Sequence, residues 1–310
     1  IHNGPAAANG PVTIDSGLAA AMGVTSATTN LLRIGNVSSQ AGFDSLNAIL
    51  TSPESHYVNL HTSLNPGGAW RSQLAPAVTA MPALSAIISS VSDENLKTTA
   101  PGGLITVFGA NLAKTATDLS GFNGLTRAPN TLNGTSATID GKTAPVLAVS
   151  PGHAVLQVPV DAAAGMRPVV VSNSNGASAP MMVEILAASP ALFFDSEGGI
   201  AFKASDNSLV RSNNPAAVGD TIYLLSTGLG LTEPRLATGQ PPTDITNLTQ
   251  PVSARIAGRE ARVLGSAAAP GMVGIYGSLV MVPAGVPSGM QPVTIGLGNT
   301  TSNTVNIAIR

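Results

Sequence analysis

The chain has 310 residues, enough for two or three compact domains with buried cores. Charged residues make up only 10%, aromatic residues only 3%, and the net charge is −2, so the basic stripe and stacking aromatics of a nucleic-acid-binding protein are missing. Cysteine is absent, which excludes disulfides, thiolate metal sites and a cysteine nucleophile. A surface this poor in charge opposes self-association only weakly.

The start of the sequence carries no targeting signal. The first residues, IHNGPAAANGPV, contain neither a basic region nor an apolar core of the kind found in signal peptides. The longest apolar runs, such as residues 82–88, are far shorter than the roughly 20 residues of a membrane span. We therefore expect no membrane span, and a chain that is processed or incomplete at residue 1.

The first predicted element is a short helix over Gly42–Leu50, because Phe43, Leu46, Ile49 and Leu50 recur on one helical face. Pro53 is expected to end this helix. The stretch HYVNLHTSLNPGGAW (56–70) follows, and its alternation predicts a strand that leads into a Pro-Gly-Gly turn.

Three of the four histidines, His2, His56 and His61, fall in this N-terminal part. Positions 56 and 61 differ by an odd number, so on a strand they face opposite sides and at most one can join His2. Neutral imidazoles on adjacent strands can bind Zn²⁺ or Cu²⁺, which makes His2 and His61 weak candidates for metal ligands. Two histidines without a nearby carboxylate favour structural hydrogen bonding instead.

These segments resemble the CHRD (chordin-type) domain, in which an H-I-H-x-G element precedes a short helix and a Y-V-N-V-H-T-x-x-x-P-G-G-E-I-R-G-Q stretch. Ala69-Trp70 and Ser72 depart from that pattern, and the matching residues are Tyr57, Val58, Asn59, His61, Thr62, Pro66, Gly67, Gly68, Arg71 and Gln73. The resemblance implies that residues 1–75 form a partial CHRD-like β module that lacks its N-terminal half. Half a sandwich leaves unpaired strand edges and an uncovered apolar face. Either upstream residues complete the sheet, or a neighbouring subunit does so by strand complementation, which can link subunits into fibres.

A Pro/Ala-rich linker is expected over residues 76–90, and the rest of the chain contains a duplication. GLITVFGANLA (103–113) aligns with DTIYLLSTGLG (220–230), and SATIDGKTAPVL (136–147) aligns with SARIAGREARVL (253–264), both at an offset of 117. After a seven-residue insertion in the second copy, VPVDAAAGMRPV (158–169) aligns with VPAGVPSGMQPV (282–293).

Each copy shows short alternating strands separated by turn pairs such as Asp140-Gly141 and Asn175-Gly176. This pattern predicts two immunoglobulin-like β-sandwiches, at 91–187 and 188–310, and an all-β fold overall. Phe193 and Phe194 are expected to be buried where the two sandwiches join.

Residues 86–310 resemble the uncharacterised C-terminal domain of large secreted acidobacterial (Solibacter-type) proteins, a region similar to tandem IPT/TIG immunoglobulin-like modules. The motifs that carry this resemblance are APGGLITVFGANLA, IDGKTAPVLAVSPGHAVLQVPVDAAAG, GDTIYLLSTGLG and VPAGVPSGMQPVTIGLGNTTSNTVNIAI. The resemblance implies an extracellular location and a structural or adhesive role, and it supplies no enzymatic activity.

Catalytic motifs are missing from the sequence: it has no G-x-S-x-G elbow, phosphate-binding loop, H-E-x-x-H or EF-hand pattern. The G-L-G of residues 228–230 is better explained as a turn than as a nucleotide site, since no βαβ context surrounds it. Asp195, Glu197 and Asp206 could form an oxygen cage for Ca²⁺, although surface carboxylates are the commoner explanation. Glycosylation sequons occur at Asn36, Asn133, Asn247 and Asn299.

These observations favour a secreted, non-enzymatic structural protein without a cofactor, whose partners are copies of itself in an extracellular or cell-surface assembly. The main alternative is a carbohydrate-binding adhesin module of a larger protein, with cell-surface polysaccharide as its partner. Such a module needs an exposed aromatic platform or a polar cleft, and one Trp and three Tyr make that feature scarce. A metal-dependent enzyme built on the histidines is a third, weaker interpretation.

Overall fold

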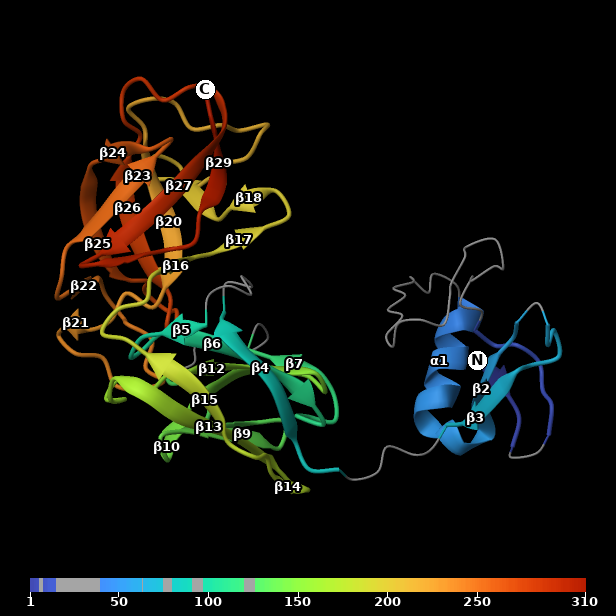
Figure 1. The fold of residues 1–310 in the computed structure, drawn as a ribbon. Coiled ribbons are helices and arrows are strands. Elements are labelled where there is room, and N and C mark those ends of the chain that lie inside the picture. The colour runs from blue at the N-terminus through green and yellow to red at the C-terminus, as the bar shows by residue number, and fades with distance from the viewer. Residues whose placement is uncertain (6–7, 15–39, 63, 75–79, 91–96, 120–125) are drawn as a thin grey trace. The chain divides into compact units, whose positions relative to one another are not determined.

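The computed structural model describes residues 1–5, 8–14, 40–62, 64–74, 80–90, 97–119 and 126–310. They divide into two compact units, Ile1–Ala80 and Met81–Arg310. Both units are built mainly from antiparallel strands, and one α-helix occurs in the described residues, which confirms the predicted all-β fold (Figure 1). No described helix is long and apolar enough to cross a membrane.

The first unit contains a three-stranded antiparallel sheet in the order β1-β2-β3 and one helix. Helix α1 runs two residues further in the N-terminal direction than predicted, and it ends just before Pro53, which occupies the first turn of the 3₁₀ helix η2. The bounds are β1 (His2–Asn3), α1 (Gln40–Thr51), η2 (Pro53–Ser55), β2 (His56–Leu60) and β3 (Trp70–Gln73).

The second unit begins with a sandwich of two sheets, antiparallel except for the parallel β5–β15 pair. One has the order β4-β6-β12-β11-β7, and the other has the order β10-β9-β13-β15-β5, with β8 on β9 and β14 on β13. Their inward side chains, among them Ile105, Ile139, Leu156 and Ile185, are fully buried in one core. The strands are β4 (Ala83–Ser89), β5 (Thr98–Thr99), β6 (Leu104–Ala110), β7 (Thr117–Asp118), β8 (Thr131–Leu132), β9 (Thr135–Ile139), β10 (Lys142–Ala144), β11 (Val146–Val149), β12 (His153–Gln157), β13 (Gly165–Asn173), β14 (Gly176–Ala177) and β15 (Met181–Ile185).

A second sandwich follows with a separate core that includes Ile222, Leu224, Ile256 and Ile295. Its sheets have the orders β16-β20-β26-β25-β22-β21, with β19 on β20, and β24-β23-β27-β28, with β29 on β27. The strands are β16 (Ala191–Leu192), β17 (Phe194–Asp195), β18 (Gly198–Gly199), β19 (Ala201–Lys203), β20 (Thr221–Thr227), β21 (Thr232–Glu233), β22 (Thr246–Leu248), β23 (Val252–Ile256), β24 (Arg259–Ala261), β25 (Val263–Ala268), β26 (Tyr276–Met281), β27 (Gly289–Leu297), β28 (Thr300–Thr301) and β29 (Val305–Ile309).

The predicted duplication is visible strand by strand. Strands β6, β9 and β10 recur 117 residues later as β20, β23 and β24, and β13, β14 and β15 recur 124 residues later as β27, β28 and β29. Even an irregularity repeats, because the register of the β11–β12 pair shifts between Val146 and Ala148 and that of the β25–β26 pair shifts between Val263 and Gly265. The sequence repeat therefore reflects two copies of one sandwich.

Strand structure begins earlier in the second unit than the predicted linker implies. Residues 83–89 fall inside the segment 76–90, yet they form β4, which pairs with β6 from Ala83 to Ser89. Ile87 and Ile88 of this strand are buried, so the apolar run belongs to the first sandwich. The sequence does not reveal this strand by alternation, because Ile87, Ile88 and Ser89 are buried in succession and the register shifts between Leu84 and Ala86.

Candidate functional site

The N-terminal unit holds the residues that the CHRD resemblance singles out, and some of them meet on one face of its sheet. His2 lies opposite Tyr57 in the β1–β2 pair, and the two rings stack with their centroids 4.8 Å apart. On the same tyrosine, the Arg71 guanidinium lies 3.6 Å from the ring centroid, a cation–π contact. Tyr57 is only 2% exposed, so this stack forms the small core of the unit.

The structure brings His2 and His61 together and keeps His56 apart. The rings of His2 and His61 lie 5.9 Å apart, while His56 is buried and its Nδ1 lies 3.0 Å from the Ser52 carbonyl oxygen. The Nδ1 atoms of His2 and His61 likewise lie 2.9 and 2.7 Å from the carbonyl oxygens of Gly10 and Pro66.

A carbonyl oxygen can only accept a hydrogen bond, so the neutral form of each of these imidazoles carries its proton on Nδ1 and has a free lone pair on Nε2. That tautomer suits both a structural role and metal ligation through Nε2. Among the described residues, no group of three or more histidine and carboxylate side chains is placed to hold a metal ion. Metal binding by His2 and His61 therefore stays a prediction.

The opposite face of the β2–β3 hairpin is apolar and exposed. Val58, Leu60 and Trp70 have 36%, 54% and 56% of their surface exposed, and Leu60 lies directly opposite Trp70 in the strand pair. We call these three residues the apolar strip. Among the described residues β3 is an edge strand, so the strip lies beside a sheet edge.

The suggested calcium cage is not supported by the structure, because a guanidinium takes up the carboxylates. Arg211 Nη2 lies 2.5 Å from Asp195 Oδ2, and Arg211 Nε lies 3.0 Å from Glu197 Oε2. Asp206 instead accepts hydrogen bonds from the backbone N–H and hydroxyl of Ser208. Of the sequon asparagines, Asn36 lies outside the described residues, and the Asn133 amide donates to Thr115.

The two sandwiches of the second unit are joined by buried hydrogen bonds at a junction that sequence reasoning did not identify. The Thr227 hydroxyl, at the end of β20, accepts a bond from the Leu104 N–H of the first sandwich at 2.9 Å. The same hydroxyl donates to the Gly274 carbonyl oxygen at 2.7 Å. Gly228 and Gly230 follow with φ values of +73° and +82°, which confirms the positive φ predicted for the glycines of the G-L-G segment.

Gln157, at the end of β12, makes the second buried link. Gln157 is only 4% exposed, and its side-chain Nε2 donates a hydrogen bond to the Gly102 carbonyl oxygen at 3.2 Å. Its Oε1 accepts a bond from the Gly239 N–H of the second sandwich at 2.6 Å. Both ends of one buried amide are thus used, one in each sandwich.

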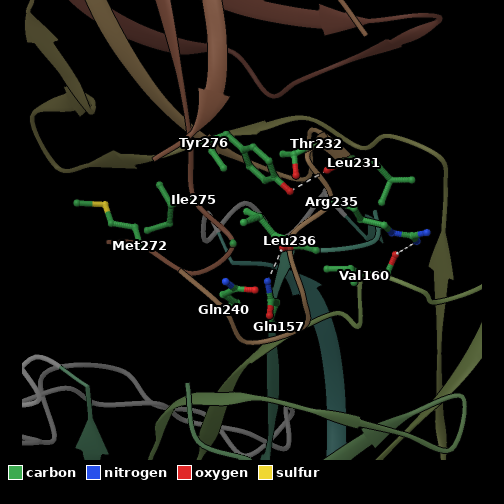
Figure 2. A pocket seen from close by; sticks show the side chains of 14 residues that line it. Gln157, Val160, Leu231, Thr232, Arg235, Leu236, Gln240, Met272, Ile275 and Tyr276 are labelled. Atoms are coloured by element: carbon green, nitrogen blue, oxygen red, sulfur yellow. Dashed lines mark hydrogen bonds between the residues drawn. The ribbon is translucent and has the colours of Figure 1, made fainter. Parts of the chain in front are cut away.

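A small cavity remains between these links (Figure 2). The Tyr276 hydroxyl donates to the Gly230 carbonyl oxygen at 2.8 Å, and burial raises the pKa of this hydroxyl. Arg235 closes the other side by donating from Nη2 to the Val160 carbonyl oxygen at 2.7 Å. The enclosed space is about 20 Å³, room for about one water molecule, which excludes a sugar or a peptide from this cavity.

The junction is made where the second copy departs from the first. The seven-residue insertion lies between β25 and β26, and it supplies Met272, Gly274 and Ile275 to the cavity wall. Tyr276 stands at the place of Gly152 in the repeat, and Gln157 has Met281 as its counterpart. The insertion and these two differences between the copies are the sequence features that mark the junction. The predicted repeat rested on the matching residues alone.

Phe194 does not lie where the sequence placed it. Its side chain is 40% exposed on the hairpin β17–β18, whereas Phe193 is half-buried. The expected burial of Phe194 at the junction was therefore wrong.

Residues 1–74 match the family model described as the CHRD domain, which supports the first part of the resemblance drawn above. The match covers about a quarter of the chain. No curated protein matches the chain.

Several solved structures are similar to parts of the chain. They include SGBP-B of the mixed-linkage glucan utilization locus of Bacteroides ovatus, in complex with a mixed-linkage heptasaccharide (13% identity, 82% of this chain, 53% of that chain, TM-score 0.33). Others are SGBP-B from a complex xyloglucan utilization locus in Bacteroides uniformis (12%, 73% and 49%, TM-score 0.22) and domains 5–6 of the S-layer protein SbsC (12%, 74% and 98%, TM-score 0.23). The chain spans about half the length of the two Bacteroides proteins, and at these scores the similarity carries no conclusion about function.

Proposed function

We propose that the chain is a non-enzymatic structural module of an extracellular or cell-surface assembly, joined to further copies of itself through the β2–β3 hairpin. The observation that carries this proposal is the apolar strip of Val58, Leu60 and Trp70, exposed beside an edge strand. An edge strand offers main-chain hydrogen bonds to a strand of another chain, and an apolar face beside it adds side-chain burial.

The energetics favour covering this strip. Complete burial of a large apolar side chain stabilises by about 1.5–3 kcal/mol, so Leu60 and Trp70 together could contribute several kcal/mol to an interface. Charge repulsion between copies is small, because the first 80 residues contain only five charged side chains: Asp15, Arg33, Asp44, Glu54 and Arg71.

The second unit supports the same proposal by its construction. The Thr227 and Gln157 side chains link the two sandwiches through buried hydrogen bonds. A cavity that holds about one water molecule leaves no room for a substrate at this junction. Such a pair of sandwiches suits the role of a stiff spacer.

The test is sedimentation velocity over a range of chain concentrations. The wild-type chain is expected to form species larger than the monomer, and the double substitution Leu60→Ser with Trp70→Ser is expected to shift it to monomer. A matched control is Ile245→Ser, which removes an apolar side chain that is 74% exposed on the second sandwich. A wild-type chain that stays a monodisperse monomer, or a control that dissociates the chain equally, contradicts the proposal.

A second candidate function, glycan binding, is favoured by one observation. Phe194 presents an exposed ring beside the carboxylates of Asp195 and Glu197. Sugar rings pack their C–H faces on aromatic rings and offer their hydroxyls to carboxylates and amides. The chain would then be an adhesive module whose partner is a cell-surface polysaccharide.

A further inference from the structure

A groove on the second sandwich lies between the hairpin β17–β18 and the neighbouring strands β27 and β29. Its volume is about 390 Å³, within the range of about 300–1,000 Å³ that is usual for small-molecule sites. The lining residues are Phe194, Asp195, Ser196, Glu197, Gly198, Met290, Thr304, Val305 and Asn306. Figure 1 shows the hairpin beside the sheet that contains β27 and β29.

The hairpin is held close to β29 by a glycine. A Cβ at Gly198 would overlap the Asn306 carbonyl oxygen and approach the Met290 methyl group to 3.1 Å, and the φ of +128° at this position also favours glycine. Glycine at this position therefore allows the hairpin to lie close against β29.

The lining combines an apolar surface with polar groups. Phe194 and Met290 have 40% and 44% of their surface exposed, and they supply the apolar part. Asp195, Glu197 and Asn306 supply hydrogen-bonding groups around it.

Arg211 holds the carboxylates of Asp195 and Glu197 in place. Its side chain is 13% exposed, it contacts Asp195 and Glu197, and its Nη1 donates to the Gly199 carbonyl oxygen at 3.2 Å. A carboxylate has about four lone-pair sites, so each of the two still has capacity to accept bonds from a ligand hydroxyl. Because Arg211 already orders these side chains, they lose less conformational entropy when a ligand binds them.

The charges of the groove select among ligand classes. Two carboxylates repel an anionic ligand, while the guanidinium between them disfavours a divalent cation. A purely apolar ligand would leave the polar groups without partners. A neutral polyhydroxylated ring can pack on the apolar part of the lining and also donate hydrogen bonds to its polar groups.

We propose that this groove is a binding site for neutral saccharide units, with Phe194 as the stacking surface and Asp195 and Glu197 as acceptors for sugar hydroxyls. The proposal rests on the second candidate function and locates it in the chain. It is independent of assembly through the apolar strip, which lies in the other unit.

The experiment is isothermal titration of the chain with a soluble neutral β-glucan, a neutral galactomannan and anionic polygalacturonate, combined with a glycan array. Wild type should bind at least one neutral glycan and not polygalacturonate. Phe194→Ala should weaken that binding about tenfold, which corresponds to about 1.4 kcal/mol. Glu197→Gln, which keeps one acceptor oxygen, should weaken it less.

The matched control is Phe108→Ala, because Phe108 is 38% exposed on the first sandwich. It should leave binding unchanged, and Phe194→Ala should leave the sedimentation profile unchanged. Absence of binding to every neutral glycan, preference for polygalacturonate, or equal losses in Phe194→Ala and Phe108→Ala would overturn the proposal. A monomeric wild-type chain that still binds glycan would instead contradict only the assembly.

Discussion

Substituting Gln157 by methionine tests whether buried hydrogen bonds hold the junction between the sandwiches. Methionine occupies the equivalent place in the second copy, at Met281, and nearly preserves the side-chain volume. The substitution therefore leaves the packing in place and removes the partners of the Gly239 N–H and the Gly102 carbonyl oxygen. Each buried group without a partner costs about 1–3 kcal/mol.

The two unpartnered groups together give an expected loss of unfolding free energy of about 2–3 kcal/mol. This value is near the lower end of the summed cost, because the adjacent cavity can admit one water molecule that bonds to one of the groups. Guanidinium denaturation followed by circular dichroism measures it. The control is Gln250→Met at an exposed position, where a change within about 0.5 kcal/mol is expected. A Gln157→Met chain as stable as this control would refute the reasoning.

Three further outcomes are expected. Thr227→Val, which is nearly isosteric, should lower the unfolding free energy by about 1–3 kcal/mol in the same assay, because the buried Leu104 N–H loses its acceptor. Burial raises the pKa of the Tyr276 hydroxyl, so this phenol ionises at lower pH in the unfolded chain than in the folded chain. Its contribution to the free energy of unfolding is therefore complete below about pH 10 and is lost as the pH rises further. Tyr276→Phe should accordingly flatten the alkaline decline of the melting temperature, and an unchanged decline would count against this assignment. Calorimetric titration with Zn²⁺ and Cu²⁺ should show no heat if His2 and His61 are structural, and heat that His61→Ala abolishes would establish a metal site.

The sequence predicted the sandwiches well because a duplication supplies its own check. Strand alternation and the offset between copies pointed to the same elements, and the observed strand registers repeat at that offset. The parity of a strand also separated His56 from His61, since alternate side chains face opposite sides.

Contacts between side chains that are distant in the sequence could not be predicted from the sequence. Arg211 lies 16 and 14 positions from Asp195 and Glu197, and only the fold shows that it fills the space between them. Phe194 was predicted to be buried because large aromatic side chains usually are, yet it lies on a hairpin outside the core. Gln157 was passed over since a lone glutamine carries no motif, and its role depends on a loop about 80 residues away.

Electron microscopy of the negatively stained chain tests the assembly most directly. If copies join through the β2–β3 hairpin, wild-type particles should associate into filaments or other regular multimers, and the chain with Leu60→Ser and Trp70→Ser should appear as single particles. Wild-type fields that contain only dispersed single particles, at concentrations well above those of the sedimentation experiment, would contradict the account.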